Sequence, residues 1–155
     1  MKVNFLLISI AVILLSQWSN AQHIYSTHLK GCETSRFALE RDKPTAIMDK
    51  EELQGLIVEN INQETFKKLK GTIKLQIIAY KDNTSCLLSY ENKTNKTASE
   101  IGIADLEQFI KNDLVWNRVT ENAAVLVELK FKKGRVNSRR MGMSGKKGWH
   151  ELDLN

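Results

Sequence analysis

The fold is decided by one stretch of the chain, Gly71-Thr72-Ile73-Lys74-Leu75-Gln76-Ile77-Ile78-Ala79. From Ile73 onward an apolar residue recurs at every second position, and most of the positions between are polar. A period of two is typical of a β-strand that has one face on a core. Residues 81–84 then supply the polar side chains that favour a turn. The stretch therefore predicts a strand over 71–79 that turns back into a second strand.

Two helices are predicted on either side of this hairpin. Asp49 followed by Glu52 resembles a capping box, and the apolar residues after it recur at helical spacing. This pattern predicts a helix over about 49–62. Apolar residues from Ile103 to Ile110 are three or four positions apart, which predicts a second helix of two to three turns.

Two more strands complete the predicted order. The return strand of the hairpin is expected over about 85–91, with Cys86, Leu88 and Tyr90 on one side. Alternating apolar residues predict a last strand over about 123–131. The order helix, strand, strand, helix, strand indicates an α+β fold, a small antiparallel sheet with helices packed on one face. A length of 155 residues with 42% hydrophobic residues fits one domain and argues against global disorder.

The beginning of the chain resembles a cleavable secretory signal. Lys2 precedes an apolar run from Phe5 to Leu15, and small residues stand three and one positions before a predicted cut at Gln22. The run is well short of the roughly 20 apolar residues that span a bilayer, which argues against a membrane anchor. We therefore expect residues 1–21 to be a signal peptide and the chain to be secreted or periplasmic. An extended lead-in is expected over 22–43.

Two cysteines, Cys32 and Cys86, fall in the part of the chain predicted to be exported. In an oxidising compartment such a pair can close a disulfide. The sequence leaves two alternatives, a bridge between them or two buried free thiols. A redox site is not expected, because the chain has no Cys-x-x-Cys motif.

Several motifs follow one another in a recognisable order between residues 44 and 131. A helix precedes the Gly-led strand that starts at Gly71, and the second helix precedes Trp116-Asn117-Arg118-Val119. Glu121-Asn122 then stands near the turn before the last strand. This succession resembles the C-terminal domain of TonB and stand-alone TonB-C-like domains, whose motifs are Gly-x-Val-x-Val-x-Phe, Trp-x-Pro-Ala and Asn-Gly. The resemblance implies an α+β domain that binds extended peptides at a sheet edge.

The chain also departs from a TonB energy transducer. Such a protein needs an uncleaved membrane anchor and a long Pro-rich reach, whereas this chain has a single Pro and a short apolar run. Arg118 stands where the family has Pro, and the chain continues past Phe131. The resemblance therefore implies a fold and a binding habit and does not imply energy transfer.

Basic residues are concentrated after the last predicted strand. Between residues 130 and 147 there are eight of them and no acid, so the rest of a chain with a formal charge of +5 is net negative. We expect 132–155 to be a basic tail, either a solvated mobile segment or a site for anionic lipid or glycan. Its candidate anion-binding residues are Lys132, Lys133, Arg135, Arg139, Arg140, Lys146 and Lys147.

No pattern in the chain indicates catalysis, a metal or a cofactor. The three histidines, His23, His28 and His150, are widely spread and lack a metal-ligand spacing. Trp116 lies between a helix and a strand, which favours a core or rim aromatic over a ligand platform. We therefore predict a protein that is not an enzyme and binds no cofactor.

The leading hypothesis is a non-enzymatic envelope module that binds a protein or peptide by strand addition. The predicted edge is the last strand, with candidate residues Val125, Val127, Glu128, Leu129 and Lys130. Edge pairing could equally make a homodimer. The alternative hypothesis is an interaction protein that binds anionic lipid or glycan through the basic tail. Nucleic acid is not an expected partner of an exported protein.

Overall fold

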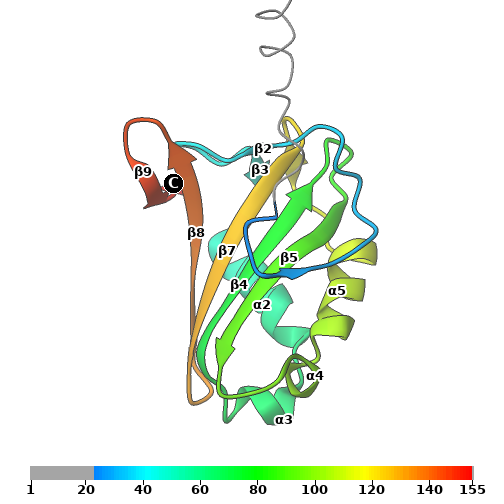
Figure 1. Ribbon diagram of the computed structural model, residues 1–155, viewed down its shortest axis with the longest axis vertical. Coiled ribbons are helices and arrows are strands. Elements are labelled where there is room, and N and C mark those ends of the chain that lie inside the picture. Colours follow the sequence, from blue (N-terminus) through cyan, green and yellow to red (C-terminus); the bar gives the residue numbers. More distant parts are fainter. Residues whose placement is uncertain (1–22, 155) are drawn as a thin grey trace, which may run out of the picture.

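The computed structural model describes residues 23–154, which form a mostly antiparallel sheet with helices on one face (Figure 1). Seven strands make this sheet, in the order β1-β5-β4-β7-β8-β9 with β2 paired to β7 beside that path. Its strands are β1 (Thr27–His28), β2 (Ala38–Leu39), β4 (Lys70–Ala79), β5 (Ser85–Thr94), β7 (Ala123–Lys132), β8 (Val136–Ser144) and β9 (Gly148–Glu151). A separate two-stranded pair consists of β3 (Ala46–Ile47) and β6 (Arg118–Val119). The predicted α+β class is confirmed.

The predicted signal peptide, residues 1–21, lies outside the described residues. Within residues 23–154, no helix has both the length and the apolar character needed to cross a membrane. The segment predicted as an extended lead-in contains only the two-residue strands β1 and β2 up to residue 43.

The predicted central hairpin is present. β4 pairs with β5 on one side and with β7 on the other, and all three strands are ten residues long. The alternating residues of β4 that were expected on a core, from Ile73 to Ala79, are fully buried. Burial of apolar surface of this kind is the main stabilising term of a small domain. The period of two in the sequence therefore located the centre of the sheet correctly.

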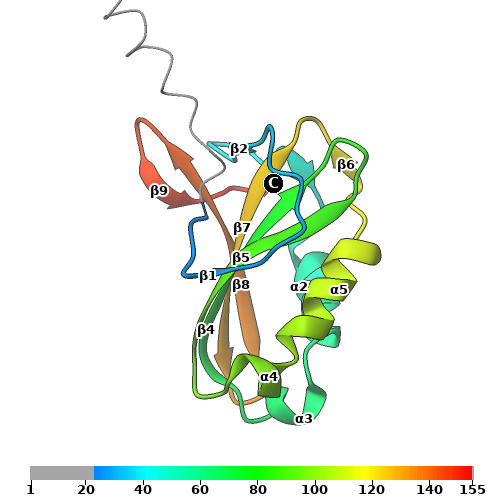
Figure 2. The ribbon, with the colours of Figure 1, turned by 45° about the vertical axis from the view of Figure 1, so that its right-hand side comes forward.

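Four helices cover one face of the sheet in the described chain: α2 (Lys50–Glu59), α3 (Gln63–Phe66), α4 (Ala98–Ile101) and α5 (Ile103–Asn112). Figure 2 shows α2 and α5 side by side against this face. The helix predicted over 49–62 begins as expected, because Asp49 accepts hydrogen bonds from the backbone of Glu51 and Glu52. The capping box of the structure lies elsewhere, between Thr97 and Glu100, where the sequence indicated only a polar connection.

The opposite face, called the outer face here, carries Thr72, Lys74, Gln76 and Ile78 of β4. The lead-in crosses this face in both ribbon views (Figures 1 and 2). Phe37 and Leu39 of the lead-in pack there against Ile78 and Leu88, in a second and smaller apolar cluster. A register irregularity opposite Gln76 and Ile77 interrupts the alternation of β5. Tyr90 consequently packs against the main core, so its predicted place on the side of Cys86 and Leu88 is wrong.

The C-terminal region, 132–155, is not the tail that the sequence suggested. β7 turns through Lys133 and Gly134, which both have positive φ, and the chain returns as β8 alongside β7. A second turn leads to β9, which pairs with β8 and ends the sheet. Figure 1 shows β8 and β9 as its outermost strands on that side. The boundary predicted at 131/132 is wrong, because the sheet continues through it.

Alanine substitutions at two glycines are expected to change the free energy of unfolding in opposite directions. Gly71 has φ +113°, and a Cβ built there would lie 2.2 Å from the carbonyl oxygen of Lys93. We expect Gly71→Ala to lower the free energy of unfolding by about 1–3 kcal/mol, measured by urea denaturation. Gly55 lies within α2 with nothing within 4 Å of such a Cβ, so Gly55→Ala should raise it by about 0.5–1 kcal/mol. A Gly71→Ala variant as stable as the wild type would contradict this account of the β4–β5 contact.

Candidate functional site

The two cysteines are joined in a disulfide between Cys32 of the lead-in and Cys86 of β5. This resolves the alternatives that the sequence left open in favour of the bridge. Cys86 is nearly buried, and Cys32 packs at the margin of the apolar cluster on the outer face. The bridge therefore fastens the lead-in to the sheet.

The predicted peptide-binding edge is not an edge. β7 pairs with β4 along its whole length, and from Leu126 to Phe131 it also pairs with β8. Its first residues, Ala123 and Ala124, pair with β2. Strand addition at β7 is therefore excluded, because both sides of the strand are occupied. The candidates Val125, Val127, Glu128, Leu129 and Lys130 divide between the core, which takes Val125, Val127 and Leu129, and the outer face, which takes Glu128 and Lys130.

The residues predicted as an anion-binding tail are dispersed by β8 and β9. Arg140 is buried in an ion pair with Glu40, and Arg139 pairs with Glu128 on the outer face. Lys146 and Lys147 lie at the β8–β9 turn, where Lys147 is 3.5 Å from a carboxylate oxygen of Asp42. Only Lys132, Lys133 and Arg135, at the β7–β8 turn, stay together and exposed. The single tail site is therefore wrong, since its residues lie in four different places.

An ionic ladder crosses the outer face. Its members occupy register-paired positions on four neighbouring strands, in the order Glu91, Lys74, Glu128 and Arg139. The nitrogen-to-oxygen distances along this row are 3.3 Å, 4.0 Å and 2.7 Å. Signs alternate along the row, so each charge is offset by its neighbours.

A groove lies beside this ladder on the outer face and is named the outer groove here. Its floor is formed by Leu126 of β7 and Met141 of β8, and its volume is about 380 Å³. Ile24 and Tyr25 of the lead-in line it together with Trp149 of β9. Three ladder residues, Lys74, Glu128 and Arg139, complete the lining. The arrangement is an apolar trough bordered by charges that already compensate one another.

The lead-in side of the outer groove is held by backbone contacts to the sheet. The amide of Ile24 donates to the side-chain oxygen of Gln76 at 2.9 Å, and the amide of Tyr25 donates to the Ser89 hydroxyl at 3.3 Å. Burial, together with the carboxylates of Glu128 and Glu91, raises the pKa of Tyr25 to about 12. The Tyr25 hydroxyl therefore keeps its proton at neutral pH.

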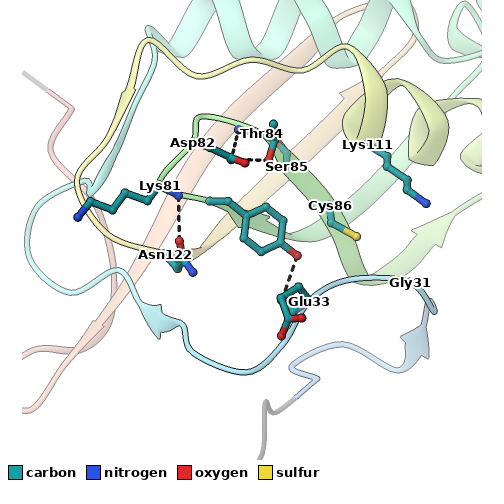
Figure 3. Close-up of a pocket in the computed structure, with 10 residues that line it drawn as sticks. Gly31, Glu33, Lys81, Asp82, Thr84, Ser85, Cys86, Lys111 and Asn122 are labelled. Atoms are coloured by element: carbon teal, nitrogen blue, oxygen red, sulfur yellow. Dashed lines mark hydrogen bonds between the residues drawn. The ribbon is translucent and has the colours of Figure 1, made fainter.

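A second depression of about 610 Å³ lies at the β4–β5 turn, beside the disulfide (Figure 3). Its carboxylates are engaged locally: Asp82 accepts from the amide and hydroxyl of Thr84, and Glu33 accepts from the amide of Ser35. These hydrogen bonds lower the pKa of both carboxyl groups. Cys86 lines this depression but is bridged, so it supplies no thiolate nucleophile. The Thr84 hydroxyl and the Asp82 carboxylate are engaged with each other within the β4–β5 turn, where the hydroxyl donates to Asp82 at 2.6 Å.

No metal centre is formed by the part of the chain that the structure describes, where no group of three or more His, Cys, Asp or Glu side chains could hold an ion. The rings of His23 and His28 stack with centroids 4.0 Å apart. His150 lies far along the chain on β9, with Nδ1 2.9 Å from the carbonyl oxygen of Gly148. Trp116 is buried as a core aromatic, and its Nε1 donates to the Ser85 hydroxyl at 2.8 Å.

A cluster of basic side chains, which the sequence indicated only in part, lies at one end of the sheet. Lys68 and Lys70 precede and open β4, and the register of the sheet pairs Lys70 with Lys132. The backbone amide of Lys133 donates to the carbonyl of Leu69 at 3.2 Å, which holds the β7–β8 turn against the start of β4. The basic end is defined as Lys68, Lys70, Lys130, Lys132, Lys133 and Arg135. The signal that could have found it is the antiparallel pairing of the first and last predicted strands.

Comparisons with known proteins place the chain beside no relative. No protein-family model, curated protein or solved structure matches it. The outer groove and the basic end are the two surfaces of the described chain on which a partner could bind.

Proposed function

We propose that this protein is an exported, non-enzymatic binding module of the bacterial envelope that captures an extended peptide in the outer groove. The succession α2, β4, β5, α5, β7 is the element order on which the resemblance to TonB-C-like domains rests. The disulfide supports an oxidising compartment, such as the periplasm or the exterior. β8 and β9 are additions to that order, and they form one side of the groove.

The observation that carries this proposal is the exposure of Trp149. Its side chain is 51% exposed although the groove beside it is apolar, and its cross-strand partner Met143 is 39% exposed. Trp is among the side chains that contribute most to binding at interfaces, because it buries a large rigid surface. An exposed Trp next to an apolar groove is a favourable binding site for an apolar side chain of a partner.

The groove indicates what kind of peptide residue it would take. Leu126 and Met141 offer an apolar floor, and the charges of Glu128 and Arg139 already satisfy one another. A neutral apolar or aromatic side chain fits such a site, because an extra charge there would lack a partner and would lose hydration. We therefore propose that the strand addition implied by the resemblance takes place at β9 instead of β7. β9 ends the sheet beyond β8 and carries Trp149.

Replacing Trp149 should abolish peptide capture. The probe is an array of nine-residue peptides whose central position is varied, applied to the chain that begins at Gln22. We expect peptides with a central apolar residue to bind, and Trp149→Ala to weaken that binding at least about 10-fold, as loss of a hot-spot residue does. The matched control is Val115→Ala, which truncates a side chain that is 61% exposed on the segment between α5 and β6.

Equal binding of the Trp149→Ala and wild-type chains would overturn the proposal, as would an array on which the wild type binds no peptide. Association of the chain with itself is a separate outcome. Sedimentation of the wild type would then show a dimer that Trp149→Ala dissolves, and the peptide array would stay empty. That result would replace the peptide by a second copy of the chain.

A further inference from the structure

The basic end is a group of cations that contains no acidic residue. In the described part of the chain, none of its six side chains has a carboxylate within ion-pair distance. The acidic residues of the adjoining elements are engaged by other cations: Glu64 by Lys67, Glu100 by Lys96, Glu91 by Lys74 and Lys93, and Glu128 by Arg139. Apart from the attraction between Glu64 and Lys68, the positive charge of this surface is therefore not compensated locally.

The sheet arranges part of these cations in rows. In one row, successive strands present Lys93, Thr72, Lys130 and Asn137 on the outer face. In the next, Lys70 stands opposite Lys132. Neighbouring strands are about 4.8 Å apart, and alternate residues of one strand are about 7 Å apart. In the first row Thr72 stands between Lys93, which pairs with Glu91 at 3.0 Å, and Lys130, and Asn137 ends the row.

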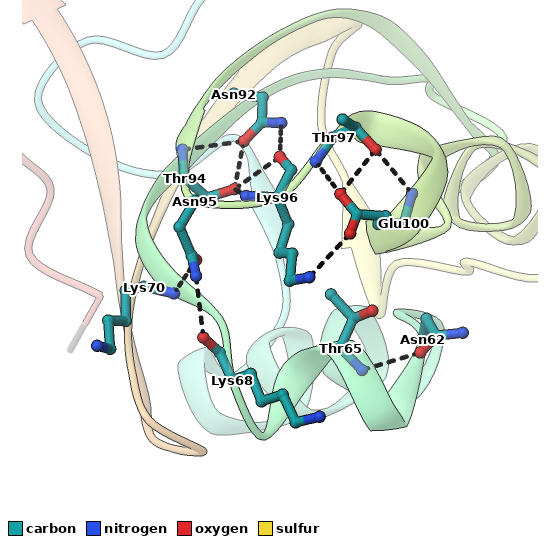
Figure 4. Close-up of polar contacts among 10 residues, drawn as sticks. All are labelled: Asn62, Thr65, Lys68, Lys70, Asn92, Thr94, Asn95, Lys96, Thr97 and Glu100. Atoms are coloured by element: carbon teal, nitrogen blue, oxygen red, sulfur yellow. Dashed lines mark hydrogen bonds and ion pairs between the residues drawn. The ribbon is translucent and has the colours of Figure 1, made fainter.

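The facing lysines lower the stability of the fold, and backbone hydrogen bonds fix the chain at these positions. Like charges directly across a strand pair are unfavourable, and Lys70 faces Lys132 in that way. Figure 4 shows the Asn95 amide between the backbones of Lys68 and Lys70, whose ammonium ends extend away from it. The Asn95 side chain accepts from the Lys70 amide at 2.7 Å and donates to the Lys68 carbonyl at 3.3 Å. The backbone is therefore fixed where the lysine side chains repel one another. An anionic partner would relieve that repulsion.

We propose that the basic end binds a linear anionic polysaccharide. Thr72 and Asn137, on either side of Lys130, supply hydrogen bonds of the kind that sugar hydroxyls accept and donate. The exposed large apolar side chains of the described chain, Val115, Met143 and Trp149, lie on other elements, so the basic end has no anchor to insert among lipids. The aromatic residues nearest in sequence are Phe131, which is buried, and Phe66, which packs edge-on against it, so neither offers a platform on which nucleic-acid bases could stack.

The test compares two triple variants of equal charge. The first, Lys70→Gln/Lys130→Gln/Lys132→Gln, removes three cations of the basic end. The second, Lys81→Gln/Lys111→Gln/Lys146→Gln, removes three exposed cations elsewhere. Binding to heparin and to polygalacturonate is measured over a range of salt concentrations, with neutral dextran and phosphatidylglycerol vesicles as further probes.

The basic-end variant is expected to bind both anionic polysaccharides at least 10-fold more weakly than the wild type, and the control variant within 2-fold of it. The slope of log affinity against log salt should fall by roughly two to three in the first variant only, because fewer counterions are released. Removing facing lysines relieves repulsion, so this variant should fold; the single Lys132→Gln variant tests the same point with a smaller change. Equal losses in both triple variants, or tighter binding to vesicles than to polysaccharide, would overturn the proposal.

This site is independent of the outer groove. Trp149→Ala is expected to leave polysaccharide binding unchanged, and the basic-end variant to leave peptide capture unchanged. Failure of one proposal would therefore not be mistaken for failure of the other.

Discussion

Replacing Arg140 by Met is expected to lower the free energy of unfolding by about 3–5 kcal/mol, because it leaves the carboxylate of Glu40 buried without its partner. The side chains of Arg140 and Glu40 are 3% and 0% exposed. Two hydrogen bonds join them, one from Nε to Oε2 at 2.7 Å and one from Nη2 to Oε1. A planar guanidinium paired in this bidentate way with a carboxylate is among the strongest side-chain contacts.

The pair also joins four segments of the chain. Glu40 lies in the lead-in, after β2, and accepts from the amides of Thr45 and Ala46 at 2.7 Å and 3.1 Å. Arg140 donates to the carbonyl of Ala46 and lies 5.4 Å from the ring centroid of Trp116. The lead-in, β3, β8 and the segment before β6 therefore lose a shared anchor when either charge is removed.

The neighbouring arginine supplies the control. Arg139→Met removes an equal charge one residue away, but the Arg139 side chain is 48% exposed and its pair with Glu128 lies on the outer face. Its loss should cost less than about 1 kcal/mol. Both variants are measured by urea denaturation with a common slope. Similar midpoints for Arg140→Met and Arg139→Met would contradict the view that burial makes the Glu40 pair decisive.

The centre of the sheet could be predicted from the sequence because its alternation is apolar. β4 and β7 direct Ile, Val, Leu and Phe side chains toward the helices, so the period of two is visible without any partner. The helices α2 and α5 follow for the same reason, from Leu53, Ile57, Leu106 and Ile110. Each of these elements is defined by residues close together in the chain.

β8 could not be found by that criterion. Apart from Val136, which packs against the main core, its inward positions are Ser138, Arg140, Gly142 and Ser144, which are polar or lack a side chain. Arg140 is acceptable inside only because Glu40 meets it, and the two are 100 residues apart in the chain. A basic run that contains a buried arginine therefore looks like a solvated tail in the sequence, because the glutamate that pairs with the arginine is distant in the chain.

The basic end was missed in part for a related reason. Lys132, Lys133 and Arg135 were among the candidates, but Lys68 and Lys70 reach them only through the antiparallel register of β4 and β7. The sequence predicted both strands without assigning which residues face each other. Register is fixed by the packing of both faces and by the turns, so it becomes clear only when the strands are paired.

Removing the disulfide should be the other strongly destabilising change. Cys32 and Cys86 are separated by 54 residues, and closing a loop of that length restricts the unfolded chain by roughly 4 kcal/mol in the loop-entropy account. The loop contains the lead-in from Cys32 onward, β3, α2, α3 and β4, so most of the first half of the described chain is constrained. We expect Cys32→Ala/Cys86→Ala to lower the free energy of unfolding by about that amount in urea.

Reduction tests the same bond without a mutation. Dithiothreitol should lower the urea midpoint of the wild type toward that of the double variant and leave the variant itself unchanged. Because Phe37 and Leu39 still pack the lead-in onto the outer face, and Glu40 still pairs with Arg140, the reduced chain should remain folded in the absence of urea. A wild-type midpoint that does not respond to reductant would show that the bridge does not form or does not constrain the unfolded chain. Loss of folding on reduction alone would show instead that the lead-in depends on the bridge more than on its packing.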